Sequence, residues 1–390
     1  MTAKISAPRP AYLAVLVVAF VMGVAIAAFP GTAAADSVRD QSWQLTSLHV
    51  ADAHKITRGA GVVVAVIDDG VQTDHPDLVG NVLPGIDIYT GKPQGIENGE
   101  YHGTEMAALI AGHGHGPGHR DGVLGIAPDA KILPIKISRD GSLGDANNVT
   151  VAIRWALHLG ADVISISLAV TYDADLPDAL AEAHMKGVPV VVGAGNDRQS
   201  ALPILDGTVP VMALRQDGTI DPISQGVGKR TGLAAPGSDL PVPTGRDTYA
   251  PGTGTSMSTA IVAGGFALAR AQFPKLTADQ LAALFYRHAT DLGDPGPDII
   301  HGNGSLNIVD ALADSTLTES SPATALPTSS AVSVTNFDSS WLLTSVLIVG
   351  FIVVTLLAVV AALVGIRRRG NRRCAPGPAA LPSRTRSTTR

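Results

Sequence analysis

Four polar residues far apart in the sequence have the side chains that covalent hydrolysis requires. They are Asp68 in VIDDG, His102 in HGT, Asn196 in GAGN and Ser256 in GTSM. A serine is a weak nucleophile unless a base accepts its proton, and that base needs a third group to fix its tautomer. A side-chain amide can in turn stabilise the oxyanion that forms. These residue types therefore indicate acyl transfer by an acid, a histidine and a serine.

Two of these motifs also have structural explanations. Ser256 lies in GTSMSTAIVAGG, residues 254–265, where Ser and Thr are favoured as caps of a helix N-terminus. Asn196 lies in GAGND, whose composition favours an Asx turn. A short motif matches by chance too often to decide alone, so the four motifs must be judged together.

The elements that must position these residues alternate between two patterns. Continuous apolar runs predict buried strands, and segments of helical periodicity lie between them. The predicted strands are 61–67, 131–137, 163–168 and 188–192, and the predicted helices are 105–111, 146–159 and 176–186. This alternation predicts an α/β fold with a mostly parallel sheet and helices on both faces.

The predicted sheet also indicates where a binding or catalytic site should lie. Ligands of such sheets bind outside the carboxyl ends of the strands. Asp68 and Asp69 follow the first strand, and Asn196 closes the strand and turn VVVGAGN. Ser256 begins a helix, where the dipole and the free N–H groups favour a developing oxyanion.

The motifs occur along the chain in the order aspartate, histidine, serine that subtilisin has. Over about residues 41–312 the sequence resembles the subtilisin-like serine protease family. The resemblance implies a subtilisin-like fold and a serine endopeptidase acting on protein or peptide substrates without a cofactor. It implies Asp68 as the acid, His102 as the base, Ser256 as the nucleophile and Asn196 as a donor of the oxyanion hole.

The sequence departs from the family pattern at the acid. The family has Thr or Ser where this chain has Asp69, and the acid lies two residues before the glycine, which selects Asp68. Strand alternation places the two carboxylates on opposite faces. An ionised Asp69 near the cleft is expected to raise the pKa of His102. If Asp69→Asn were as damaging as Asp68→Asn, the assignment of the acid would fail.

A second departure lies in SISLAV, residues 165–170. Ala169 and Val170 stand where the family has glycines that let a substrate strand pair with the backbone. Their side chains predict a narrower S1 pocket, the pocket for the side chain that precedes the scissile bond. The alternative is that this segment is only the end of a strand.

The histidine-rich stretch HGHGPGH, residues 113–119, raises the question of a metal site. Zinc sites place their ligands on defined elements at fixed spacings, and this stretch is interrupted by glycines. It predicts a flexible surface loop. No acidic loop has a recognisable calcium-ligand spacing either, so no metal is expected.

The ends of the chain predict export and anchoring. Residues 1–35 have the pattern of a signal peptide, with an uncleaved anchor as the alternative because the apolar run approaches the length of a membrane span. Residues 341–366 carry no charge and predict a transmembrane helix. The arginine-rich tail, 367–390, predicts a cytoplasmic C-terminus and an extracellular body.

Between these ends the sequence predicts a leader, 36–60, a peptidase domain, 61–314, and a Ser/Thr/Pro-containing linker, 315–340. This order of segments resembles the mycosins, membrane-anchored subtilases of type VII secretion. The only cysteine is Cys374 in the predicted tail, so the body lacks the cysteines that many mycosins carry. Secretion-machine proteins are expected partners. The alternatives are a pseudoprotease that serves as a structural component of a secretion complex and a general cell-surface protease.

Charge narrows the class of partner further. All 34 acidic residues lie between Asp36 and Asp338, and that segment holds only 18 of the 28 basic residues. The predicted extracellular part is therefore strongly acidic. This balance argues against nucleic acid or an anionic surface as its main partner, and no nucleic acid is expected.

Overall fold

The computed structural model describes residues 37–93, 101–138, 146–170, 172–196, 205–224 and 232–316. The strands are β1 (Val63–Asp68), β2 (Ile86–Asp87), β3 (His113–His115), β4 (Asp121–Leu124), β5 (Lys131–Lys136), β6 (Val163–Ile166), β7 (Val190–Gly193), β8 (Thr208–Leu214), β9 (Leu233–Pro236), β10 (Leu240–Gly245) and β11 (Thr248–Gly252). The α-helices are α2 (Ser37–Asp40), α3 (Trp43–Ser47), α4 (Val50–Ile56), α5 (His102–Ala111), α6 (Ala146–His158), α7 (Leu176–Met185), α8 (Thr255–Gln272), α9 (Ala278–His288) and α10 (Ile308–Leu312). Two short 3₁₀ turns are η1 (Pro117–His119) and η3 (Pro222–Ser224).

A seven-stranded sheet in the order β2-β5-β1-β6-β7-β8-β9 forms the centre of the domain. Every neighbouring pair in it is parallel. The four strands predicted from apolar runs are β5, β1, β6 and β7, which lie next to one another in this order. The predicted parallel α/β fold is therefore confirmed.

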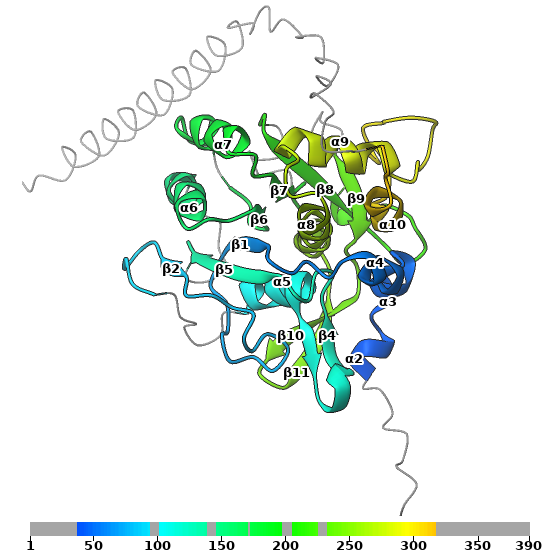
Figure 1. The fold of residues 1–390 in the computed structure, drawn as a ribbon, viewed down its shortest axis with the longest axis horizontal. Helices are drawn as coiled ribbons and strands as arrows, with labels where there is room; N and C mark the ends of the chain where they lie inside the picture. Colours follow the sequence, from blue (N-terminus) through cyan, green and yellow to red (C-terminus); the bar gives the residue numbers. More distant parts are fainter. Residues whose placement is uncertain are drawn as a thin grey trace, which may run out of the picture. The chain divides into compact units, whose positions relative to one another are not determined.

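Both faces of the sheet are covered by helices, as its apolar strands require. Along β1, Val64 and Val66 join the core cluster that contains α5 and α8, whereas Ala65 and Ile67 join the cluster that contains α6 and α7. Figure 1 shows α6 and α7 on one side of the strands and α5 and α8 on the other. Burial on both faces explains why β1 reads as a continuous apolar run rather than an alternating one.

Helix α8 runs through the middle of the larger core. Its residues from Thr255 to Arg270 are all buried. A Cβ at Gly264 would lie 2.6 Å from the Cβ of Ile126, so the small residues of AIVAGG allow the close packing that their size suggests.

The segment predicted as a leader contributes three short helices to this core. Leu48, Val50 and Ala53 are buried members of the cluster that contains α8. The indole Nε1–H of Trp43 donates to the carbonyl of Ser238 at 3.0 Å. Residues 37–56 therefore pack as part of the domain.

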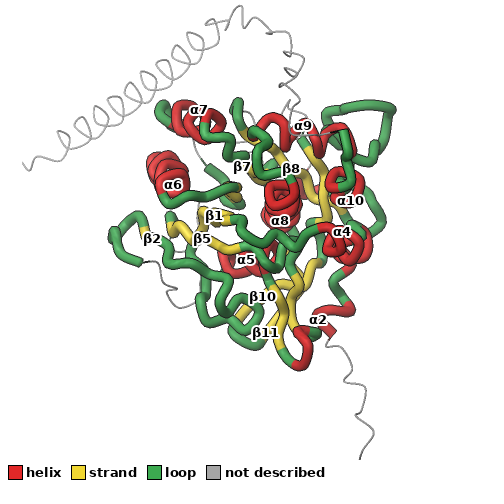
Figure 2. Tube along the Cα trace, viewed as in Figure 1, coloured by secondary structure: helices red, strands yellow, loops and turns green. Residues whose placement is uncertain are grey.

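The connections include one long irregular segment. Figure 2 shows loop throughout the chain between α9 and α10. Isolated bridges of Ser305 to Ala234 and to Thr290 fix this segment against the edge of the sheet beyond β9.

The predicted signal peptide, transmembrane helix and tail, and the linker beyond residue 316, lie outside the described residues. The chain divides into two compact units, Met1–Leu326 and Pro327–Arg390, and the described residues belong to the first. Across the described ranges, no helix has both the length and the apolar character that crossing a bilayer requires.

Candidate active site

The four predicted site residues lie at element ends on the carboxyl side of the sheet. Asp68 is the last residue of β1, and His102 is the first residue of α5. Ser256 is the second residue of α8, and Asn196 follows the end of β7 by three residues. Hydrogen bonds join these residues into two groups, Asp68 with His102 and Asn196 with the start of α8.

The acid and the histidine form a direct hydrogen bond. His102 Nδ1 lies 2.8 Å from Asp68 Oδ1, and the Asp68 side chain is 1% exposed. A carboxylate at Nδ1 places the ring proton there and leaves Nε2 as the atom that can accept a proton. This is the arrangement that a general base requires.

Electrostatics around His102 favour its protonated form. Burial acts to lower the pKa of the imidazole, but the charge and hydrogen bond of Asp68 outweigh it. The charges of Glu105 and Asp69 add to this effect, and the pKa is raised to about 9. As predicted, Asp69 contributes in the raising direction. His102 is therefore mainly protonated at neutral pH, and its capacity as a base increases as the pH rises.

Glu105 is a titratable group beside the histidine that the sequence analysis did not select. It lies three residues after His102 on α5, a spacing that puts two side chains on one helix face. Burial raises its pKa to about 7; the nearby charge of His102 opposes this shift, while those of Asp68 and Asp69 add to it. The spacing alone could have identified Glu105 as a neighbour of the histidine.

The two adjacent aspartates contact the same helix start, contrary to the expectation of opposite faces. Asp68 binds the ring of His102, and Asp69 accepts from the backbone N–H of Gly103 at 2.7 Å. Strand β1 ends at Asp68, so strand alternation does not extend to Asp69. The expectation was wrong for this reason.

Thr104 completes the HGT motif with a contact of its own. Its side-chain oxygen accepts the backbone N–H of Gln72 at 2.9 Å. The hydroxyl of this fully buried threonine thus connects the first turn of α5 to the segment after β1.

The side chain of Ser256 makes its hydrogen bond to the carbonyl of Ser167. Its Oγ donates to the carbonyl of Ser167 at 2.9 Å, and Ser167 Oγ donates back to the carbonyl of Ser256 at 3.2 Å. Catalytic hydrogen bonds are often not formed until substrate binds. The structure therefore has the Asp68–His102 pair in place and the Ser256 hydroxyl bound to the carbonyl of Ser167.

The hydroxyl side chains at the start of α8 do not act as the cap of this helix. Gly254 is the N-cap, and no side chain caps the helix from that position. Ser258 and Thr259 instead donate to the carbonyl of Thr255 within the helix, at 3.1 and 2.6 Å. Ser256 does not serve as the cap, which removes the structural explanation that the sequence left open.

Asn196 is held by the oxygen of its side-chain amide, and within the described ranges no hydrogen bond of its amide nitrogen is found. Its Oδ1 accepts both the backbone N–H and the hydroxyl of Thr255, at 3.0 and 2.9 Å. A backbone N–H can only donate, so these contacts fix which end of the amide is the oxygen. The amide Nδ2 remains available as a donor beside Gly254, which has no Cβ to obstruct it.

A pocket of about 150 Å³ adjoins Ser256 and Asn196. Its wall includes Ser167, Ala169 and Gly193. Ala169 thus lines the pocket as expected, but Val170 does not. Val170 is fully buried in the core cluster beneath α6 and α7, so of these two residues only Ala169 lines the pocket.

The histidine-rich stretch forms a β-hairpin and not the flexible loop expected from its glycines. Strand β3 pairs with β4 in antiparallel orientation, and Gly114, Gly116 and Gly118 adopt the positive φ values that their lack of Cβ permits.

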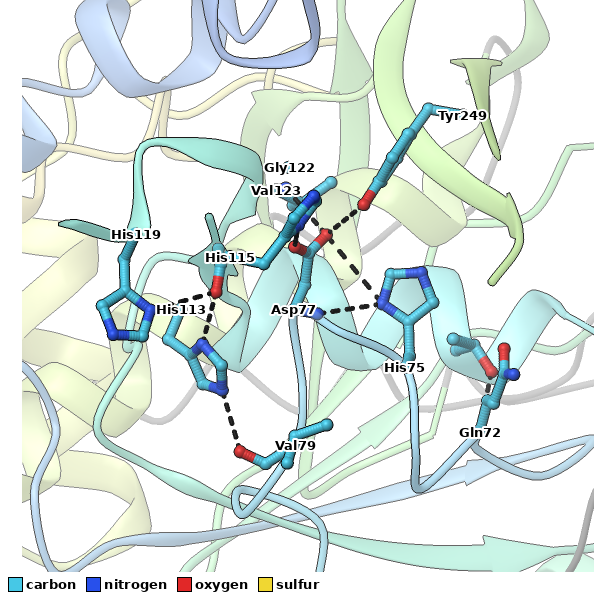
Figure 3. A network of polar contacts seen from close by, with 12 residues as sticks. Gln72, His75, Asp77, Val79, His113, His115, His119, Gly122, Val123 and Tyr249 are labelled. Carbon is cyan, nitrogen blue, oxygen red and sulfur yellow. Dashed lines mark hydrogen bonds and ion pairs between the residues drawn. The ribbon is translucent and has the colours of Figure 1, made fainter. Parts of the chain in front are cut away.

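The hairpin is anchored on Asp77, whose side chain is fully buried. His115 Nδ1 lies 2.6 Å from its Oδ1, and Tyr249 and Val123 donate to its Oδ2 at 2.9 and 2.8 Å. Figure 3 shows His115 and Tyr249 converging on this carboxylate. Among the described residues, no group of three or more His, Cys, Asp or Glu side chains is arranged to hold a metal ion.

Comparisons with known proteins identify the family of this chain. The family profile described as "Subtilase family" matches residues 59–304. Subtilisin DY of Bacillus licheniformis is 30% identical over 259 residues, which cover 64% of this chain and 90% of that protein. Mycosin-1 of Mycobacterium tuberculosis is 31% identical over 347 residues, which cover 74% of this chain and 76% of that protein.

Solved structures of a mycosin are similar as well. The crystal structure of MycP1 from Mycobacterium smegmatis has a TM-score of 0.59 and 27% identity, covering 76% of this chain and 90% of that one. A crystal structure of MycP1 with the N-terminal propeptide removed has a TM-score of 0.58 and 28% identity, covering 72% and 98%.

Proposed function

The chain belongs to the subtilase family of serine endopeptidases, and from this membership we propose that Asp68, His102 and Ser256 are its catalytic triad. Ser256 attacks the scissile carbonyl, His102 takes the hydroxyl proton and later gives a proton to the leaving amine, and Asp68 stabilises the imidazolium. The observation that carries this proposal is the 2.8 Å bond between Asp68 and His102. It leaves Nε2 of the ring as the base.

The oxyanion that forms is stabilised by two donors. The backbone N–H of Ser256 lies in the first turn of α8, where helical N–H groups have no intrahelical acceptor. The Nδ2 of Asn196 is the second donor, because Thr255 holds the amide by its oxygen. Loss of one such donor typically lowers turnover by about 100- to 1,000-fold.

One hydrogen bond must break before acylation. Ser256 Oγ donates to the carbonyl of Ser167 in this structure, so the hydroxyl has to leave this carbonyl before it can pass its proton to His102. A peptide bound along the strand end at Ser167 offers backbone N–H groups that replace the hydroxyl as donors to this carbonyl. Substrate binding then frees the hydroxyl for attack.

We also propose that the protease is exported and tethered to the membrane, and that it takes part in type VII secretion as mycosins do. The support is the predicted order of segments: signal peptide 1–35, leader 36–60, peptidase domain 61–314, linker 315–340, transmembrane helix 341–366 and basic tail 367–390. Similarity to Mycosin-1 over 74% of the chain agrees with this proposal. Its partners are peptide substrates, the membrane and secretion-machine proteins.

A second candidate is a pseudoprotease that serves as a structural component, in which the Ser256 hydroxyl keeps its bond to the carbonyl of Ser167. Labelling with a fluorophosphonate separates the two. We expect a single covalent adduct on the purified full chain and none on Ser256→Ala that has the same circular dichroism spectrum. A folded wild-type chain that stays unlabelled at pH 9 would exclude the protease and leave the pseudoprotease.

A further inference from the structure

We infer that Asp69 is a positioning residue that holds His102 in line with Asp68 by binding the backbone at the start of α5. The inference rests on the proposed triad and adds a residue to it. Asp69 Oδ1 accepts the N–H of Gly103 at 2.7 Å, and Oδ2 accepts the N–H of His102 at 3.3 Å. Asp69 therefore holds the backbone of His102, while Asp68 binds its ring.

Helix α5 needs such an acceptor from outside. Its N-cap residue is Tyr101, whose side chain makes no capping hydrogen bond. The first N–H groups of a helix have no intrahelical partner and lie at the positive end of its dipole. The Asp69 side chain, in a residue that is 2% exposed, supplies both the acceptor and the negative charge there.

The sequence of the helix start permits this contact. A Cβ at position 103 would lie 2.2 Å from the carbonyl oxygen of Gly70, 3.1 Å from the Cβ of Asp68 and 3.1 Å from Asp69 Oδ1. Gly103 thus lets the first turn of α5 approach the end of β1. The Thr or Ser of the family pattern offers one side-chain oxygen at the position of Asp69, where aspartate offers two.

The two aspartates form a closed set of contacts around His102. Asp68 Oδ1 accepts both the ring Nδ1–H of His102 and the backbone N–H of Asp69, each at 2.8 Å. The backbone between the two carboxylates is therefore fixed relative to the ring. Without the Asp69 carboxylate, the first turn of α5 loses two acceptors, and His102 loses one of its two attachments to the end of β1, the one made through its backbone.

Three acidic side chains act electrostatically on His102, two from the end of β1 and one from its own helix. Asp68 has the largest effect, followed by Glu105 and then Asp69. Removal of the Asp69 charge therefore lowers the pKa of the imidazole. A residue that only stabilised the fold would leave that pKa unchanged.

The test is the second-order rate constant for labelling of the full chain by a fluorophosphonate, measured from pH 6 to 10. We expect Asp69→Ala to be about 10- to 100-fold slower at the plateau, because small misplacements of catalytic groups cost that much. Asp69→Asn retains one acceptor oxygen and should lose about two- to tenfold. Both variants should reach half-maximal labelling at lower pH than the wild type.

Asp162→Ala is the matched control. Asp162 Oδ2 accepts the N–H of Val63 at 2.9 Å, so it holds the other end of β1 in the same way. We expect its plateau rate within about twofold of the wild type and the same pH midpoint. Equal losses in Asp69→Ala and Asp162→Ala with unshifted midpoints, or wild-type kinetics in Asp69→Ala, would overturn the inference.

The Asp69→Asn variant and the proton signal of His102 Nδ1–H provide two further readouts. If Asp69→Ala does not fold, Asp69→Asn carries the test, and a wild-type midpoint and rate in that variant would overturn the inference. If the folded wild type is not labelled, the proposed function fails. The low-field proton signal of His102 Nδ1–H still reports its bond to Asp68, and its unchanged exchange rate in the Asp69 variant would overturn the positioning role.

Discussion

Asp68, Asp69 and Glu105 share the immediate surroundings of one histidine but act on it differently. Asp68 binds the ring, Asp69 binds the backbone of the helix start, and Glu105 contributes charge from the same helix. Together they hold the pKa of His102 at about 9. Because only the neutral ring can accept the proton of Ser256, we expect acylation to increase with pH through this value.

Glu105→Gln should shift the pH dependence of acylation. Loss of its charge lowers the pKa of His102, so the half-maximal rate of acylation should occur at lower pH, and the rate at pH 7 should rise by about two- to tenfold. Stopped-flow or quench measurements with a fluorophosphonate over pH 6 to 10 provide the check. An unchanged or higher midpoint would show that Glu105 does not influence the base.

Ala169 gives a prediction about substrate choice. Ala169 lines the pocket of about 150 Å³ next to Ser256. Ala169→Gly should raise kcat/KM for peptides with Phe before the scissile bond, relative to peptides with Ala there, by about tenfold, since one methyl group in a pocket is worth this much.

Val170→Ala is the control for that experiment, because Val170 is buried in the core and lies away from the pocket wall. It should lower stability by about 1–3 kcal/mol without changing the Phe-to-Ala ratio. If Val170→Ala changed the ratio of kcat/KM for Phe peptides to kcat/KM for Ala peptides more than Ala169→Gly did, Ala169 would not be the side chain that limits the pocket.

At the scale of elements, the domain depends on how closely α8 packs against its neighbours. The helix is buried from Thr255 to Arg270 and carries Ser256 in its first turn. Two adjacent glycines in it meet different surroundings. A Cβ at Gly264 would lie 2.6 Å from Ile126, whereas one at Gly265 would have its nearest neighbour, Leu306, at 3.6 Å.

These glycines form a matched pair for substitution. Gly264→Ala should destabilise the chain by about 1–3 kcal/mol, because the added methyl overpacks the contact with Ile126. Gly265→Ala should be neutral or stabilising by up to about 1 kcal/mol, since alanine is the better helix former. Urea denaturation of both variants measures the difference. Equal changes in the free energy of unfolding would mean that α8 does not pack closely against Ile126.

The sequence predicted much of this architecture but not all of the site. The strands around β1 were evident because burial on both faces leaves continuous apolar runs. The motifs around Asp68, His102, Asn196 and Ser256 were evident because their residue types are few and their order is specific. The contact of Asp69 with α5, the bond of Ser256 to Ser167 and the hairpin on Asp77 depend on tertiary approach, which no local pattern encodes.

At the scale of the whole molecule, the helices of the predicted leader are packed against the peptidase domain. Trp43 contacts the larger core and donates to the carbonyl of Ser238. The ion pair between Lys55 and Asp52, by contrast, is exposed on the outer side of α4. The same short segment thus offers one substitution expected to matter for folding and one expected not to.

Trp43→Ala should lower the free energy of unfolding by about 2–4 kcal/mol through lost burial and a carbonyl left without its donor. Lys55→Ala should change it by less than about 0.5 kcal/mol, as exposed pairs contribute little. Thermal and urea denaturation of the purified chains give both values. A Trp43→Ala chain as stable as the wild type would mean that the leader is not part of the cooperative fold.

Asp68, His102 and Ser256 should act as one catalytic unit, so the effects of substituting them should not be additive. Residues of a unit lose their combined effect when any essential member is removed. We expect Ser256→Ala and His102→Ala each to reduce hydrolysis of fluorescently labelled casein at pH 9 by about 10⁶-fold, and the triple variant with Asp68→Asn to be no slower than either. A triple variant slower by the product of the single effects, or a Ser256→Ala chain that retains hydrolysis, would contradict the account.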